Sequence, residues 1–170
     1  MFILIEDYRC YREGLLAQGF WALLFYRICA IRHKFKSVLL RAPFAILYIF
    51  LSKISQILFG IYIGSHAKIG RRLTIEHFGC IVIHNNATIG DDVIIRQGVT
   101  IGNKTPDAPL SVPVIGNRVS IGAGAKILGG IKIGNDVQIG ANAVVITDVP
   151  DNSIAVGVPA IIKTKEKTIA

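Results

Sequence analysis

The stretch 114–145, VIGNRVSIGAGAKILGGIKIGNDVQIGANAVV, repeats an apolar residue at every sixth position. Isoleucine occupies each of these positions from Ile115 to Ile139, and Val145 takes the next one. Glycine often follows the isoleucine, as at Gly116 and Gly122. A fixed short period is typical of a solenoid, in which each coil buries its apolar face only by stacking on its neighbours. The repeat therefore predicts an all-β solenoid.

The same period extends toward the N-terminus. The six-residue positions upstream are Ile63, Ile69, Ile75, Ile83, Ile89, Ile95 and Ile101. Three such units would make one triangular coil whose inward isoleucines form columns of like side chains. Counted from Ile63 to about Val156, the repeats predict about five coils of stacked parallel strands.

Two breaks interrupt the period, and we expect the functional residues there. The first adds two residues between Ile75 and Ile83, around His77. The second spans 103–113 and carries three prolines. Because proline donates no hydrogen bond to a strand ladder, the second break predicts a loop that projects from the coil.

Residues 1–60 lose the six-residue period and show helical spacing instead. Pro43 is expected to open a helix over about 43–58, and Gly60 to end it. We therefore divide the chain into a helical region (1–60), a solenoid (61–162) and a tail (163–170). No uninterrupted apolar run reaches the ~20 residues that cross a bilayer. The N-terminus also lacks the pattern of a signal peptide, which indicates the cytoplasm.

The net charge of +8 favours an anionic partner, such as a phosphorylated cosubstrate or an acidic membrane surface. Much of the excess lies before residue 60, so peripheral membrane contact by the helices is a second expectation. Nucleic acid is not expected, because the basic residues are dispersed and no binding motif is present. The three cysteines have no C-x-x-C spacing, so neither a disulfide framework nor a zinc site is indicated.

Several strings resemble the hexapeptide-repeat acyltransferases. They are VITDVPDNSIAVGVPA at 145–160, AKIG at 67–70 followed by Glu76-His77, and IGAGAKILG at 121–129. The last two resemble the serine acetyltransferase branch, whereas IGRR at 69–72, IRQGVTIGN at 95–103 and GFWAL at 19–23 look closer to enzymes that acetylate colanic acid and capsular polysaccharide. The resemblance implies a left-handed parallel β-helix and a homotrimer with active sites between subunits. General crossover rules would predict the opposite hand.

The resemblance also implies an acetyl-CoA-dependent O-acetyltransferase that needs no metal. A hydroxyl acceptor must lose its proton as it attacks the thioester, and a neutral imidazole suits that step. His77 matches the family's catalytic histidine; the alternative is a surface or trimer-contact histidine. Glu76 and Tyr62 are expected at the acceptor, Tyr62 standing where serine acetyltransferases carry the acid that orients the histidine. Zinc carbonic anhydrases of this fold pair histidines five apart, whereas His77 and His84 are seven apart.

Four further positions match family residues that contact CoA. Backbone atoms of Ala123 and Ala141 are expected at the pantetheine arm, and a backbone donor of Asn103 at the thioester oxygen. Lys163 would meet the CoA phosphates, or else belong to a solvated tail. All four remain expectations from the resemblance.

The second break bears on the identity of the acceptor. Serine acetyltransferases carry an Arg-His pair there that binds the substrate carboxylate, and this chain has Ser111-Val112. Because an unpaired carboxylate is costly in a site, the absence of this cation predicts a neutral sugar hydroxyl in a surface polysaccharide. The alternatives are serine O-acetylation in cysteine biosynthesis and a non-catalytic trimeric scaffold.

Overall fold

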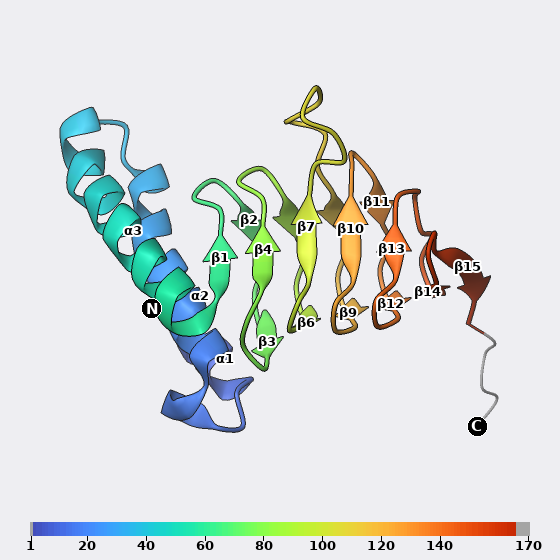
Figure 1. Cartoon of the computed structure of the whole chain (residues 1–170). Coiled ribbons are helices and arrows are strands. Elements are labelled where there is room, and N and C mark those ends of the chain that lie inside the picture. Colours follow the sequence, from blue (N-terminus) through green and yellow to red (C-terminus); the bar gives the residue numbers. More distant parts are fainter. Residues whose placement is uncertain (1, 166–170) are drawn as a thin grey trace.

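A computed structural model describes residues 2–165 and shows a helical region stacked on one end of a triangular solenoid (Figure 1). The helical elements are α1 (Phe2–Arg9), the 3-10 turn η1 (Gly14–Leu16), α2 (Gln18–Ala30), the 3-10 turn η2 (Ile31–Lys34) and α3 (Val38–Phe59). The solenoid begins directly after α3. Its far end carries the C-terminal strand.

Three sheets form the sides of the solenoid. The first contains β1 (Ile61–Ile63), β4 (Ile81–Ile83), β7 (Thr100–Gly102), β10 (Lys126–Leu128) and β13 (Val144–Val145). The second contains β2 (Lys68–Ile69), β5 (Thr88–Ile89), β8 (Val114–Ile115) and β11 (Lys132–Ile133). The third contains β3 (Thr74–Glu76), β6 (Ile94–Arg96), β9 (Ser120–Ile121), β12 (Gln138–Ile139), β14 (Ser153–Val156) and β15 (Ile161–Thr164).

The strand order confirms the solenoid of about five coils. Every pairing is parallel except that of β14 with β15, which is antiparallel. The arrangement is consistent with a left-handed β-helix, as expected. The reversed strand β15 crosses the predicted boundary between the solenoid and the tail, because it continues through Lys163.

The isoleucine columns also appear as predicted. In the third sheet Ile75, Ile95, Ile121 and Ile139 lie in register, and each is at least 97% buried. Stacking one β-branched side chain on another fills the interior without gaps, because identical shapes repeat at the strand spacing. The core is therefore one continuous cluster that runs the length of the coil.

At both breaks in the period the backbone leaves the strand ladder. The first break joins β3 to β4, and His77 and Cys80 take left-handed backbone angles there, with φ of 62° and 53°. The second break, residues 103–113, contains no strand and projects from the coil as a loop (Figure 1). The proline argument is confirmed for this loop.

Helix α3 differs from the prediction at its start. It begins at Val38, so Pro43 lies inside the helix instead of opening it. Proline there removes one helical hydrogen bond, but most of this turn is exposed, where the freed carbonyl is accessible to solvent. The end is as expected, because Gly60 has φ 64° and ψ 28°, a left-handed cap that glycine adopts without strain.

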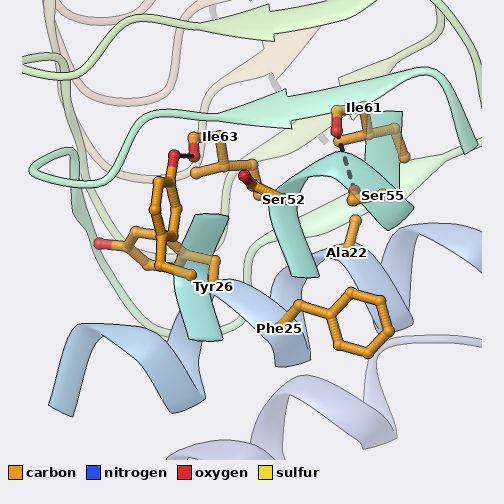
Figure 2. Close-up of a pocket in the computed structure, with 8 residues that line it drawn as sticks. Ala22, Phe25, Tyr26, Ser52, Ser55, Ile61 and Ile63 are labelled. Carbon is orange, nitrogen blue, oxygen red and sulfur yellow. Dashed lines mark hydrogen bonds between the residues drawn. The ribbon is translucent and has the colours of Figure 1, made fainter. Parts of the chain in front are cut away.

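Helices α2 and α3 cover the first coil. Ser55 donates its hydroxyl to the carbonyl of Ile61 at 2.8 Å, opposite Ala22 and Phe25 of α2 (Figure 2). Tyr48 donates to the carbonyl of Ile63 at 2.9 Å. These bonds satisfy carbonyls at the solenoid end that no further strand reaches. Much of α3 stays exposed, and by length and composition alone this helix is long and apolar enough to cross a membrane.

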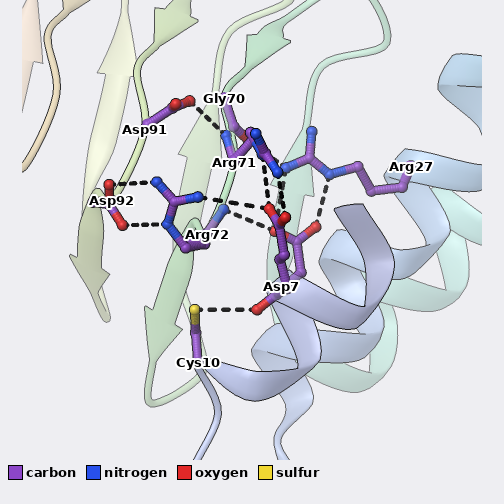
Figure 3. Close-up of polar contacts among 9 residues, drawn as sticks. Asp7, Cys10, Arg27, Gly70, Arg71, Arg72, Asp91 and Asp92 are labelled. Carbon is purple, nitrogen blue, oxygen red and sulfur yellow. Dashed lines mark hydrogen bonds and ion pairs between the residues drawn. The ribbon is translucent and has the colours of Figure 1, made fainter. Parts of the chain in front are cut away.

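An ionic network fixes α1 to the solenoid (Figure 3). Asp7 is 1% exposed and accepts hydrogen bonds from Arg27 Nε at 2.9 Å and from the backbone N–H of Arg72 at 3.0 Å. Arg27 also donates to the carbonyl of Ile69 at 2.7 Å. The buried carboxylate is thus fully paired, which burial of a charge requires.

Candidate active site

A cavity of about 540 Å³ lies between the N-terminal segment and β3. Its lining residues are Cys10, Tyr11, Arg12, Glu13, Ala17, Gln18, Gly19, Thr74, Ile75, Glu76, His77 and Phe78. One wall comes from residues before and at the start of α2, and the other from the strand that ends at the first break. The cavity therefore exists only because the helical region is docked on the solenoid.

Tyr11 holds the two walls together. Its hydroxyl donates to the carbonyl of Leu73 at 3.3 Å and accepts the backbone N–H of Ile75 at 3.1 Å. Burial raises the pKa of Tyr11, so the phenol stays neutral and keeps its donor. Gly19 makes the second contact, since a Cβ there would lie 2.4 Å from the carbonyl oxygen of Ile75. Only glycine lets α2 approach β3 this closely.

His77 follows the last residue of β3 and lines the cavity. Its left-handed φ of 62° turns the chain off the strand direction, and histidine is one of the residue types that tolerates this region. The side chain is exposed. The structure thus places the predicted base in a cavity, in the break where the sequence indicated it.

Glu76 lies beside His77 in the same cavity and is held by an arginine. It is in register with Arg96 on β6, and its Oε2 lies 3.0 Å from Arg96 Nε. Both side chains are 39% exposed, so the pair stabilises the fold by about 1 kcal/mol or less. The ion pair instead fixes the direction of Glu76 next to His77.

Arg12 and Glu13 give the cavity charges of both signs, and the sequence analysis did not identify them. They lie in a turn between α1 and η1, where the predicted helical region is interrupted. The Tyr11 contact that brings them to β3 joins residues 64 positions apart. No local sequence signal marks such a contact.

Ala123 and Ala141 lie on the same corner of the solenoid as His77. Backbone hydrogen bonds connect successive coils along this corner: Gly98 N–H to Gly79 O at 2.9 Å, Gly124 N–H to Gln97 O at 2.8 Å and Asn142 N–H to Ala123 O at 2.8 Å. The corner carries small residues and runs from the coil of His77 toward the far end. Three of the predicted site residues are therefore aligned.

The other predicted site residues lie elsewhere on the chain. Asn103 starts the projecting loop, and its Nδ2 donates to the carbonyl of Thr105 at 2.8 Å. Lys163 is exposed on β15. Tyr62 lies on β1 and its hydroxyl is 3.4 Å from Asn85 Oδ1. None of these three lines the cavity that holds Glu76 and His77.

The fold and site together define the class of protein. A parallel-strand solenoid of six-residue repeats presents a histidine at a break in its first coil, beside a cavity. Residues 113–147 match the family described as bacterial transferase hexapeptide (six repeats). The class is that of the hexapeptide-repeat transferases.

Comparison with known proteins narrows this class to one family. The serine acetyltransferase of Helicobacter pylori strain J99 is 44% identical over 153 residues, which cover 90% of this chain and 85% of that protein. A solved serine acetyltransferase in complex with CoA is 36% identical with a TM-score of 0.75, over 86% of this chain and 58% of the other. The Neisseria gonorrhoeae serine acetyltransferase in complex with serine is 35% identical with a TM-score of 0.73, over 85% and 56%. This chain belongs to the serine acetyltransferase family.

Two expectations are corrected by these relatives. The predicted membership of the colanic acid and capsular polysaccharide branch is not supported, and the predicted sugar acceptor is wrong. The sugar argument assumed that a carboxylate-binding cation must come from the loop 103–113. Arg12, which lies outside this loop, lines the cavity of His77. The chain spans little more than half the length of the two solved structures.

Proposed function

We propose that this chain is a serine O-acetyltransferase that transfers the acetyl group of acetyl-CoA to the hydroxyl of L-serine, in cysteine biosynthesis. The observation that carries the proposal is the 44% identity with a serine acetyltransferase over 90% of the chain. The position of His77 in a charged cavity agrees with it. A serine-bound and a CoA-bound relative have the same fold.

In the proposed reaction, His77 acts as the general base. Its imidazole takes the proton of the serine hydroxyl as the oxygen attacks the thioester carbonyl. A C–O bond forms, and the carbonyl π electrons move to oxygen, where hydrogen-bond donors stabilise the oxyanion. Collapse of this intermediate breaks the C–S bond. The leaving thiolate takes the proton from the imidazolium, which yields O-acetylserine and CoA and restores His77.

Acetyl-CoA would lie along the corner that begins at His77. The wall there is built of small residues, among them Ala123, Gly124 and Ala141, which leave room for a long arm beside the backbone. Asn103 and Lys163 remain proposed contacts of the thioester and the phosphates. Tyr62 remains a proposed contact of the acceptor, which a neighbouring subunit would have to bring near the cavity.

A homotrimer with sites between subunits is part of the proposal. Its support is the family fold and the exposed corner, where Ala141 and Asn142 are open to a second chain. Light scattering coupled to gel filtration tests it, with three times the mass of 18.5 kDa expected. A monomer that retains full activity would exclude sites between subunits.

Peripheral membrane contact by α3 also remains a proposal. Its support is the exposed apolar side chains of this helix and the basic residues Arg41 and Lys53 within it. Flotation with anionic lipid vesicles at low and high salt tests the contact, because charge attraction weakens with ionic strength. Protein that stays at the bottom of the gradient at both salt concentrations would contradict it.

The test of the function is acetylation of L-serine with acetyl-CoA, followed by release of free thiol. The His77→Ala substitution is expected to lower kcat by about 10²–10⁴-fold, as removal of a general base does. His66→Ala is the matched control, because His66 is exposed and does not line the cavity; within residues 2–165 its ring hydrogen-bonds to the neighbouring Ser65 hydroxyl and lies against the ring of His33. Near-full activity of His77→Ala would remove His77 from the mechanism, and no transfer to serine by the parent protein would overturn the function.

A further inference from the structure

Serine carries a carboxylate and an ammonium, so its binding site needs charges of both signs. The loop 103–113 does not supply the cation at 111–112, where other serine acetyltransferases carry their Arg-His pair. There Ser111 uses its hydroxyl to accept the backbone N–H of Gly130 at 2.8 Å, and Val112 is buried. The cation must come from a side chain that reaches the cavity of His77.

Arg12 is the arginine that lines this cavity. Within residues 2–165 it forms no ion pair, and its side chain is exposed. Arg96 is excluded by its position, because it does not line the cavity and lies behind Glu76, which it contacts at 3.0 Å. Arg27 and Arg72 are occupied by Asp7 and Asp92. Among the residues that the structure describes, Arg12 is therefore the cation with a free guanidinium at the site.

We infer that Arg12 binds the carboxylate of the serine acceptor and that Glu13 and Glu76 face its ammonium. This inference rests on the proposed function. The planar guanidinium matches a carboxylate with two parallel hydrogen bonds, which gives both affinity and orientation. Held by its carboxylate at one wall, serine would direct its hydroxyl to His77 at the other.

The segment that carries Arg12 is already fixed before substrate arrives. The adjacent Tyr11 is 8% exposed and makes two hydrogen bonds to the backbone around β3. Gly19 locks the start of α2 against Ile75. A backbone held on both sides of Arg12 lowers the ordering cost of binding, because only the arginine side chain must become fixed.

The experiment compares L-serine with ethanolamine, which has the same hydroxyl and amine but no carboxylate. Arg12→Gln is expected to lower kcat/KM for serine about 10- to 100-fold, as loss of one partner of a partly exposed charge pair does. Activity with ethanolamine and the KM for acetyl-CoA should not change. Arg12→Lys should restore part of the serine activity, because it keeps the charge without the planar fork.

Arg9→Gln is the control variant, because Arg9 is an exposed arginine at the end of α1 that does not line the cavity. It should act on serine as the parent protein does, and melting curves should show that Arg12→Gln is folded. If folded Arg12→Gln prefers serine over ethanolamine as strongly as the parent, the inference is wrong while the function stands. The same holds if Arg96→Leu abolishes the preference and Arg12→Gln does not. A parent protein inactive on serine would overturn the function itself.

Discussion

The solenoid and the helical region of this chain are stabilised in opposite ways. The solenoid repeats one contact, an isoleucine stacked on the isoleucine of the next coil, along each of three sides. The helical region depends on a few individual contacts: the buried Asp7–Arg27 pair, the Tyr11 hydroxyl and the close approach at Gly19. In the solenoid any coil resembles its neighbours, whereas in the helical region each contact is unique.

This difference bears on how the residues of the candidate site are held in position. His77 comes from the repetitive part, and Arg12 from the part held by unique contacts. The cavity between them is as stable as the docking of the two regions. Loss of a single docking contact should therefore disturb the geometry of the site even where it leaves the solenoid folded.

The largest effect is expected from Asp7→Ala. It leaves Arg27, whose side chain is 9% exposed, without its counter-ion, and breaking a buried pair costs about 3–5 kcal/mol. Trp21 in α2 is the chain's single tryptophan, so its fluorescence follows unfolding of the helical region in urea. Hydrogen exchange should show faster exchange in α1 and α2 while the coils beyond β6 keep their protection.

The matched control is Asp136→Ala, which breaks the exposed pair with Arg118 and should barely change the stability, because water already screens both charges. If Asp7→Ala and Asp136→Ala destabilise the protein equally, the helical region does not depend on its buried pair. Equal loss of protection in all coils would also contradict the separation of the two regions.

A slightly smaller effect is expected from Ile95→Ala, in the middle of a column. Ile95 is 0% exposed, and removing its three side-chain carbons beyond Cβ should cost about 2–5 kcal/mol in the free energy of unfolding. Ile121→Ala, one coil further, should cost a similar amount because its surroundings repeat. Urea unfolding of both variants at one protein concentration tests this, and unequal costs would show that the coils are not equivalent.

The smallest effect is expected from acid. The hydrogen bond from Arg71 lowers the pKa of Glu6 below its ordinary value of 4.5, and Arg72 lowers that of Asp92 below 3.8. A carboxylate whose pKa is lowered by folding stabilises the folded state above its unfolded pKa, and this contribution is lost as the pH falls through the folded pKa. Urea midpoints followed by Trp21 should therefore drop below about pH 4.5, less so in Glu6→Gln. An identical drop in that variant would exclude Glu6 as a cause.

The sequence predicted the solenoid because the contacts that build it repeat at a fixed period. The registers of Ile75 with Ile95 and of Ile95 with Ile121 follow from spacing alone. The position of His77 was also predictable, since it lies in a break of that period. The prediction that Pro43 opens its helix was wrong, because an exposed helical turn tolerates a lost hydrogen bond that a buried turn would not.

The acceptor side of the site was not predictable in this way. Arg12 and Glu13 reach the cavity through Tyr11, whose contacts with Leu73 and Ile75 span more than sixty residues of sequence. Nothing in the local pattern around Arg12 indicates that partner. The prediction of a sugar acceptor, which the serine acetyltransferase relatives contradict, rested on the absence of an Arg-His pair in the loop 103–113, and Arg12 lies outside that loop.

A stack of identical coils has no inherent length, since each new coil presents the same open edge as the last. Within residues 2–165, both ends of the stack carry a different element. Helices α2 and α3 cover the first coil, and β15 runs backward beside β14 with Lys163 exposed on it. A reversed strand interrupts the parallel repeat, and a lysine on an edge strand discourages pairing with another chain, so end-to-end fibres of stacked coils are disfavoured.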